Sequence, residues 1–492
     1  MPYASDVQRK AIWAKKSLNL RLAEKKEKKM AKEASYYGIE KLAATFKLQE
    51  QQKRVLDKLD SEDALLVYHD FGSGKSLTGL AAGDKFNKPV TIIGPAALRH
   101  NFPKEKAKHG IQSKINIYTY NKPPTGPNGV LLFDEAHKMG RLESKRSHYP
   151  DVIKGDKTLF MTGTPIRNHP SELIPIMRGL NVDIDRSKKG FEEEFIETIK
   201  KNPNILSRIF LGVKPGVEYD IKNVDKLKNM LKGKVDYHAP SIENYPSVVE
   251  KDIIVSMTPR QNTAYNMVMK GRPDLAYKVR HGLAPSKTEA SQLNAFLMAA
   301  RQVSNIPVEY NMSSTIDDAP KMHRAVSEIK KRINSDPNYK GVTYSNFLKS
   351  GIEPMSELLK DVPHILFTGK QTDKQRFEAI KAYNSGKVKQ LLISGAGAED
   401  LDLKGTKLLQ ILEPYWNEPL LDQVRGRVAR YKSHSHLPEN ERKVEIQNYL
   451  SIPLESGLIF KTQDTGSDEY LRRLAARKNE LNQKFLKVLQ IV

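Results

Sequence analysis

Short apolar runs alternate with longer mixed stretches along most of the chain. The runs of the N-terminal half are ALLVYH (64–69), VTIIG (90–94), INIYT (115–119), GVLLFDE (129–135) and TLFMTG (158–163). Those of the C-terminal half are GVTYSN (341–346), HILFTG (364–369), QLLISG (390–395) and KLLQILE (407–413). Apolar runs with helix-length stretches between them are typical of strands buried on both faces of a parallel sheet. We therefore predict an α/β fold with two parallel-sheet lobes.

The segments outside these two sets are expected to be mostly helical. Residues 167–250 and 257–318 have the pattern of helices and polar loops, and DIIVS (252–256) between them is expected to be the last strand of the first lobe. Residues 468–492 predict a basic amphipathic helix. Residues 7–34 contain ten basic and three acidic residues and no Pro or Gly. This pattern predicts a basic helix that either lies against DNA or is simply solvated.

The charge balance bears on the kind of partner. Lys and Arg number 81 against 58 Asp and Glu in 492 residues, so the net charge is 81 − 58 = +23. Such an excess favours a polyanion, most simply nucleic acid, although a soluble protein that merely tends basic is the plainer alternative. The chain has no cysteine, which excludes disulfides, cysteine-ligated metal sites and thiol nucleophiles. No apolar run approaches the roughly 18–20 residues that span a bilayer, and the charged N-terminus is no secretory signal. We expect a soluble intracellular protein.

The stretch HDFGSGKS (69–76) lies between an apolar strand and a helical segment, which is the context of a phosphate-binding loop. Gly72 and Gly74 let backbone N–H groups approach phosphates, and the positive end of the following helix adds attraction. Lys75 would contact the β- and γ-phosphates and Ser76 would ligate magnesium. His69 stands where such loops usually begin with glycine, and Gly-Lys-Ser also occurs by chance in ordinary loops. The predicted nucleotide-binding residues of this loop are Asp70, Gly72, Ser73, Gly74, Lys75 and Ser76.

A pair of acidic residues follows the fourth apolar run. Asp134 and Glu135 come directly after GVLLF, as the acids of a Walker B element do. Asp134 would hold magnesium together with Ser76, and Glu135 would orient and activate the attacking water. Paired acids after a strand are otherwise a cap for the next helix. Two such elements, each after its own strand, favour a nucleoside triphosphatase that uses ATP and Mg²⁺.

The order of further motifs resembles that of superfamily-two helicases. Asp-Glu-Ala-His (134–137) and TGTPIRN (162–168) look like motifs II and III, and TGTPIRN resembles the Swi/Snf-type branch of double-stranded DNA translocases. The nearest likeness is to the Swi/Snf-like ATPases of large DNA viruses, of the poxvirus nucleoside triphosphate phosphohydrolase I type. That likeness is carried by PYWNEPLLDQVRGRVARYKSHSHLP (414–438) and by the tail. The other matching segments are KLQEQQ (47–52), 90–110, 255–268, 341–347, 366–384, 391–405 and 423–434.

This resemblance covers roughly residues 46–492 and implies two RecA-like lobes. It predicts a basic N-terminal arm, a first lobe with a helical insertion, a helical linker, a second lobe and a C-terminal helix. The corresponding boundaries are 1–45, 46–256 (insertion about 167–250), 257–318, 319–462 and 463–492. The sequence departs from the branch where His69 and Asp70 replace its usual Asp-Glu. It also has Asp400 where motif V has glycine, which puts a backbone contact there in doubt.

The resemblance also implies roles for residues outside the phosphate loop. Gln52 would contact the adenine, and Arg427 and Arg430 would act as arginine fingers from the second lobe. By itself, RGRVAR fits a basic helix on a phosphate backbone equally well. Residues implied to couple hydrolysis to movement are Thr162, Thr164 and Gln423. Those implied to contact nucleic acid, each of which could be an ordinary loop or cap residue, are Pro95, Arg99, Thr119, Ser345, Asn346, Thr368, Gly369 and Ser394.

The function that follows is an ATP-driven translocase on double-stranded DNA. It would serve viral transcription, packaging or remodelling of DNA-bound proteins, with RNA polymerase or another transcription or replication protein as partner. An RNA helicase is the second hypothesis. The third is a transcription-factor subunit that uses an inactive ATPase fold as a DNA clamp, against which the intact Lys75, Glu135, Arg427 and Arg430 argue.

Overall fold

The structure is a computed structural model. It describes residues 48–70, 72–95, 101–126, 129–203, 205–239, 245–310, 314–395, 401, 403–415, 418–430, 432–454 and 465–492. The predicted basic arm, Arg99 and Asp400 lie outside these residues.

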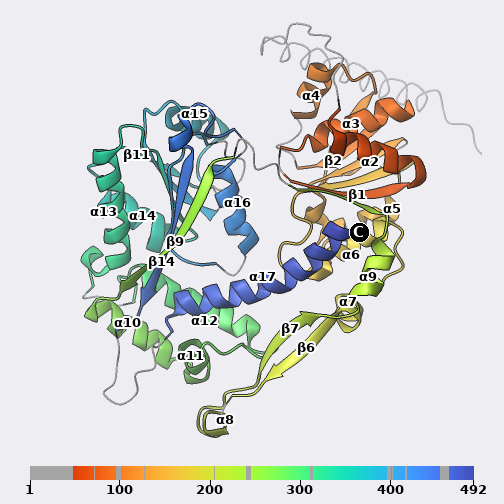
Figure 1. Ribbon diagram of the computed structural model, residues 1–492. Helices are drawn as coiled ribbons and strands as arrows, with labels where there is room; N and C mark the ends of the chain where they lie inside the picture. Colours follow the sequence, from red (N-terminus) through yellow and green to blue (C-terminus); the bar gives the residue numbers. More distant parts are fainter. Residues whose placement is uncertain are drawn as a thin grey trace, which may run out of the picture. The chain divides into compact units, whose positions relative to one another are not determined.

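Two six-stranded sheets organise the described residues (Figure 1). The strand orders are β3-β2-β4-β5-β1-β8 in the first sheet and β11-β12-β10-β13-β14-β9 in the second. The neighbouring strands whose registers are known are parallel. The strands of the first sheet are β1 (Ala64–His69), β2 (Val90–Gly94), β3 (Ile115–Thr119), β4 (Val130–Asp134), β5 (Lys157–Thr162) and β8 (Val235–His238). Those of the second are β9 (Ser247–Ser256), β10 (Gly341–Ser345), β11 (His364–Phe367), β12 (Gln390–Ser394), β13 (Leu408–Ile411) and β14 (Lys443–Ile452).

The predicted α/β class with two parallel sheets is confirmed, and each of the nine predicted runs contains a strand. One placement was wrong. Residues 252–256 form part of β9, but β9 pairs with β14 at the edge of the second sheet rather than closing the first. The first sheet instead ends at β8, which pairs with β1. The local pattern identified 252–256 as a strand, but the strand with which it pairs depends on contacts between residues far apart in the sequence.

Helices join the strands and cover the sheets. The longer helices of the first part of the chain are α2 (Glu50–Ser61), α3 (Lys75–Phe86), α4 (Asn101–His109), α5 (Tyr149–Val152), α6 (Ile174–Gly179), α7 (Lys188–Phe195), α8 (Ile205–Leu211) and α9 (Val224–Leu231). Those of the remainder are α10 (Pro259–Lys270), α11 (Pro273–Arg280), α12 (Ala290–Asn305), α13 (Pro320–Ser335), α14 (Glu353–Leu358), α15 (Asp373–Asn384), α16 (Glu418–Val428) and α17 (Ser467–Ile491). Within the described residues, no helix is both long enough and apolar enough to cross a membrane.

The central strands of the second sheet are buried on both faces, whereas its edge strand β9 is mostly exposed. Successive strand residues belong to opposite cores: Leu391 packs with α15 and α16, whereas Leu392 packs with α13 and α14. Figure 1 shows α13 and α14 on one side of this sheet and α16 on the other. Since side chains alternate between the faces of a strand, a doubly covered strand is apolar at most positions, and the buried polar side chains of Thr343 and Gln410 hydrogen-bond to each other. This explains the continuous apolar runs of the sequence.

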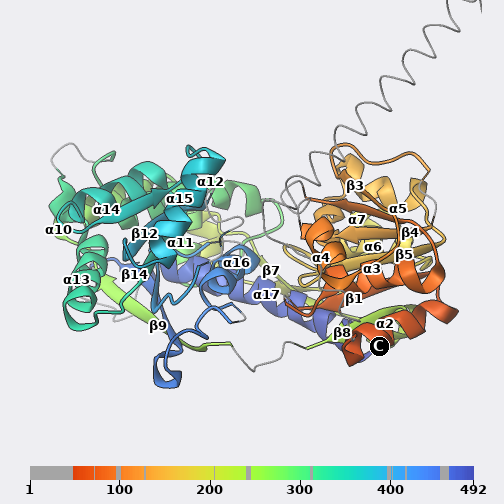
Figure 2. The same ribbon diagram turned by 90° about the horizontal axis from the view of Figure 1, so that it is seen from above.

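Two glycines let α3 approach the strands of the first sheet closely. A Cβ on Gly79 would come within 2.5 Å of Leu132 Cδ1, and one on Gly83 within 2.3 Å of Val90 Cγ2. Glycine within a helix costs roughly 0.5–1 kcal/mol relative to alanine. Here it permits a contact that alanine would block. Helix α3 also packs beside α2 (Figure 2), and this packing fixes the start of α3, where the phosphate loop ends.

The region predicted as helices and polar loops also contains a β-arm. Strands β6 (Ile196–Lys201) and β7 (Gly216–Ile221) pair antiparallel, and α8 lies at the end of the arm (Figure 1). Separately, α10, α11, α12 and the start of α17 share one apolar cluster. The predicted tail helix is confirmed as α17, with Tyr470 and Leu471 in that cluster.

Candidate active site

The phosphate loop joins the end of β1 to the start of α3. Gly72 and Gly74 have φ of 81° and 79°, a left-handed conformation that residues with a Cβ seldom adopt. Ser73 closes the turn by donating its Oγ–H to the carbonyl of Asp70 at 2.8 Å. Gly74 is the N-cap and Lys75 the first helical residue of α3, and the first turn of an α-helix is a favoured place for an anion because its N–H groups have no acceptor within the helix. The glycine spacing of the sequence thus has the conformational basis that a phosphate loop requires.

Gln52 supports this loop from α2. Its Nε2 donates to the carbonyl of Gly74 at 3.2 Å, and its Oε1 accepts from the N–H of Gln49 at 2.9 Å. The side chain is 2% exposed, and a Cβ on Gly74 would lie 2.4 Å from Nε2. Both polar ends of Gln52 therefore hold the loop and the helix start. The predicted contact to adenine stays a prediction.

His69 is explained by a partner far along the chain. Its Nε2 lies 2.6 Å from Asp236 Oδ1 of β8, and both side chains are fully buried. Strand β8 runs beside β1, with Val67 opposite Asp236 and His69 opposite His238. The histidine at the first-glycine position is thus part of a buried polar pair between two strands. Asp236 was not identified from the sequence, because nothing in its local pattern marks it.

The Walker B acids lie at the end of β4. Asp134 is 6% exposed, and its carbonyl accepts a hydrogen bond from the Tyr120 hydroxyl at 2.9 Å. Glu135 has a left-handed backbone with φ of 53°. A non-glycine residue held there costs on the order of 1–3 kcal/mol, and such strain clusters at functional sites. Strand β4 thus ends in a turn at Glu135.

The TGTPIRN loop is tied to the DEAH box by His137. The Nδ1 of His137 lies 2.8 Å from Thr162 Oγ1 and 3.3 Å from Thr164 Oγ1. The N–H of Thr164 also donates to Thr162 Oγ1 at 3.0 Å. The structure therefore brings both predicted coupling threonines to one histidine. The sequence motif contains His137, but its pattern predicts no role for this residue.

The predicted residues of the second lobe's motif VI lie on or just after α16. Arg427 contributes to a small apolar void with Val342 and Val424, and Arg430 follows the helix, its N–H donating to Ser433 Oγ at 3.1 Å. Gln423 is partly buried on the same helix. The finger roles of the two arginines stay predictions.

The predicted nucleic-acid residues gather at the carboxyl ends of parallel strands. Ser345 and Ser394 are opposite each other where β10 and β12 end, and Thr368 directly follows β11, whose partner is β12. In the first sheet, Thr119 ends β3 opposite Gly94, next to Pro95. Open α/β sheets bind ligands at this edge.

Burial separates these residues into two groups. Ser345, Thr368 and Ser394 are 0%, 5% and 7% exposed. The hydroxyls of Ser345 and Thr368 donate to Glu413 and Gln371. The neighbouring Asn346 is partly exposed and Gly369 fully so. The buried hydroxyls therefore shape the loops, while Asn346 and Gly369 lie where a ligand can reach them.

These features define a class: a phosphate loop and a Walker B element on one RecA-like sheet, and a second RecA-like sheet that carries the remaining motifs. Residues 124–309 match the model of the SNF2-related domain, and residues 321–432 match that of the helicase conserved C-terminal domain. A protein of Acanthamoeba polyphaga mimivirus, named as an ATP-dependent RNA helicase, is 30% identical over 464 residues, which cover 90% of this chain and 96% of the relative. The chain belongs to the SNF2-related ATPases with a helicase C-terminal domain, and it is an ATP hydrolase.

Further similarities are more distant. A termination factor NPH-I homolog of African swine fever virus is 25% identical over 555 residues, covering 87% of this chain and 75% of the relative. The solved SWI2/SNF2 ATPase core of Sulfolobus solfataricus, in complex with double-stranded DNA, has 18% identity and a TM-score of 0.35. The match covers 84% of this chain and 90% of the solved chain. The predicted resemblance to Swi/Snf-type ATPases of large DNA viruses is confirmed.

Proposed function

We propose that the protein is an Mg²⁺-dependent, ATP-driven motor that moves along double-stranded DNA during viral transcription. The observation that carries the proposal is the SNF2-related match over residues 124–309, which contains the DEAH box and the TGTPIRN loop. The net charge of +23 supports a polyanionic track.

In the first lobe, Lys75 neutralises the β- and γ-phosphates while the first turn of α3 donates backbone N–H groups. The donor set suits magnesium, because Ser76 and Asp134 offer the hard oxygen ligands that it prefers. Gly94 leaves room beside this carboxylate, since a Cβ there would lie 3.9 Å from Asp134 Oδ2. When bound, magnesium would neutralise phosphate charge. Glu135 orients the attacking water and accepts its proton.

In the second lobe, Arg427 and Arg430 contribute positive charge to the transferring phosphoryl group, an effect of about 10³–10⁵ in rate for arginine fingers. ATP drives movement only if it binds the closed arrangement of the lobes better than the open one. The contacts of His137 to Thr162 and Thr164 support a role for this triad in passing the state of the DEAH box to the TGTPIRN loop.

The exposed positions at the strand ends suit a phosphate backbone. Asn346 offers its side-chain amide and Gly369 its backbone N–H, and such donors contact phosphates without reading sequence. The relatives from African swine fever virus are named termination factors. This name supports a role in transcription and a partner among the transcription proteins.

An RNA helicase is the second candidate, because the mimivirus relative carries that name. ATP hydrolysis by the full chain should be compared with no nucleic acid, duplex DNA, single-stranded DNA and RNA. We expect the greatest stimulation by duplex DNA, together with displacement of a triplex-forming strand from duplex DNA when ATP is present. Stimulation by RNA alone would establish the second candidate. Glu135→Gln serves as the control, because it should abolish both signals while nucleotide binding remains.

A further inference from the structure

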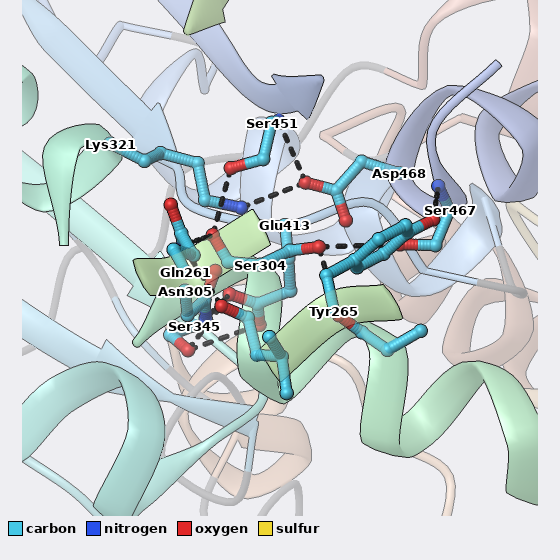
Figure 3. Close-up of polar contacts among 12 residues, drawn as sticks. Gln261, Tyr265, Ser304, Asn305, Lys321, Ser345, Glu413, Ser451, Ser467 and Asp468 are labelled. Atoms are coloured by element: carbon cyan, nitrogen blue, oxygen red, sulfur yellow. Dashed lines mark hydrogen bonds and ion pairs between the residues drawn. The ribbon is translucent and has the colours of Figure 1, made fainter. Parts of the chain in front are cut away.

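A buried carboxylate stands behind the predicted nucleic-acid contact of the second sheet. Glu413 follows β13 and is fully buried. Its Oε1 accepts the N–H of Asn346 at 2.5 Å, and Ser345 Oγ lies 3.0 Å from both of its oxygens. Figure 3 shows the carboxylate lying against Ser345 and Asn305. The carboxylate thus fixes the backbone where β10 ends and the partly exposed Asn346 begins.

Helix α12 holds this carboxylate from the other side. Asn305, its last residue, donates Nδ2–H to Glu413 Oε2 at 2.8 Å and is itself fully buried. One turn earlier, the Arg301 guanidinium lies 4.9 Å from the Phe347 ring and 5.5 Å from the Tyr415 ring. Arg301 therefore contacts the segments that follow β10 and β13, and Asn305 contacts the second of them.

The end of α12 is in turn anchored to β14 and α17. The carbonyl of Ser304 accepts from Ser451 Oγ at 2.8 Å, and its hydroxyl lies 3.2 Å from Ser467 Oγ (Figure 3). The next residue of α17, Asp468, forms a fully buried ion pair with Lys321. Buried hydrogen bonds of this kind are costly to leave unmade, so they define one arrangement of α12.

We infer that Glu413, held by Asn305, is a positioning residue that fixes the backbone of Asn346 and so presents the Asn346 side-chain amide to the nucleic acid. This rests on the proposed function, because it assigns a cause to the nucleic-acid affinity of the motor. Neither residue touches ATP or the track. Their effect is to keep the 345–347 segment in one conformation. The segment then loses no conformational entropy when it contacts phosphate.

The test compares Glu413→Leu, which removes both acceptor oxygens, with Glu413→Gln, which retains one for the Asn346 N–H. In Glu413→Gln the amide of Asn305 can turn to present its oxygen. We expect Glu413→Leu to raise the duplex DNA concentration for half-maximal ATPase stimulation about tenfold, the size of effect given by a lost charge-assisted hydrogen bond. Glu413→Gln should stay within about threefold, and Asn305→Leu should lie between. The KM for ATP and the rate without DNA should not change.

Thr343→Val is the matched control. It removes two buried hydrogen bonds in the same sheet, one donated to Gln410 at 2.9 Å and one accepted from Gln390 at 3.0 Å, without touching Glu413. It should therefore lower stability and leave the DNA requirement unchanged. Amide exchange of residues 345–347 should speed up in Glu413→Leu alone. If duplex DNA stimulates the parent protein and Glu413→Leu needs the same DNA concentration for half-maximal stimulation, the positioning role is overturned. A parent protein that no nucleic acid stimulates overturns the proposed function itself, while amide exchange still decides whether Glu413 holds the segment.

Discussion

The Lys321–Asp468 ion pair offers the sharpest test of how much a buried charge pair beside the second sheet contributes to stability. The ammonium and carboxylate are 2.8 Å apart and both side chains are 0% exposed. Asp468 Oδ2 also accepts the N–H of Ser451 at 3.0 Å. Asp468→Asn keeps an oxygen for Ser451 and removes only the charge. Lys321 is then left as a buried cation without its counter-ion.

Leaving one member of a buried pair uncompensated costs about 3–5 kcal/mol. At 1.4 kcal/mol per factor of ten, this is an increase of about 10²- to 4 × 10³-fold in the population of the opened state. Native-state hydrogen exchange of the first turns of α17 measures that population directly, without requiring the whole chain to unfold in one step. Adding Lys321→Met to Asp468→Asn should recover most of the loss, because no buried charge remains.

A pair of equal length on the surface is the control. Lys330 and Asp361 also lie 2.8 Å apart, but their side chains are 40% and 60% exposed. Water screens such a pair, so Asp361→Asn should hardly change exchange in the neighbouring helix. If Asp468→Asn and Asp361→Asn had equally small effects, burial would not be what gives the Lys321–Asp468 pair its strength.

Three further predictions address catalysis, acid stability and the N-terminal arm. Glu135→Gln should lower the rate of ATP hydrolysis about 10²- to 10⁴-fold while leaving nucleotide affinity nearly unchanged; full activity would show that another group activates the water. Burial raises the pKa of Glu445, but hydrogen bonds from Lys251, Gln447 and Arg332 outweigh it and bring this pKa from 4.5 to about 2. The lowered pKa stabilises the fold above pH 4.5, and the contribution is lost as the pH falls toward 2. Acid unfolding of Glu445→Gln should therefore depend less on pH in that window, and an unchanged profile would refute the assignment. Deleting residues 1–40 should flatten the dependence of DNA affinity on salt concentration, because fewer counterions are released; an equal slope would mean that the arm does not contact DNA.

The conformation of the loop before Lys75 was predictable because its cause is local. Gly72 and Gly74 lie within three residues of Lys75, and the left-handed conformation that they adopt is the one that glycine favours. The contacts of Gln52 show the limit of such reasoning. Its two polar ends are engaged by Gln49 and Gly74, which only the packing of α2 beside α3 could reveal.

The sequence by itself determined the strands of the nine apolar runs, because a strand covered on both faces is apolar at most positions, and this is a property of neighbouring residues. It did not identify β8 or β14. The tertiary structure decided which strands pair. It placed β9 beside β14 and β8 beside β1. It also brought together residues far apart in the chain, such as His69 with Asp236 and Asn305 with Glu413. These contacts join residues that are separated by more than a hundred positions in the sequence. The free energy that selects them comes from burial of the assembled core, so the local sequence pattern does not predict them.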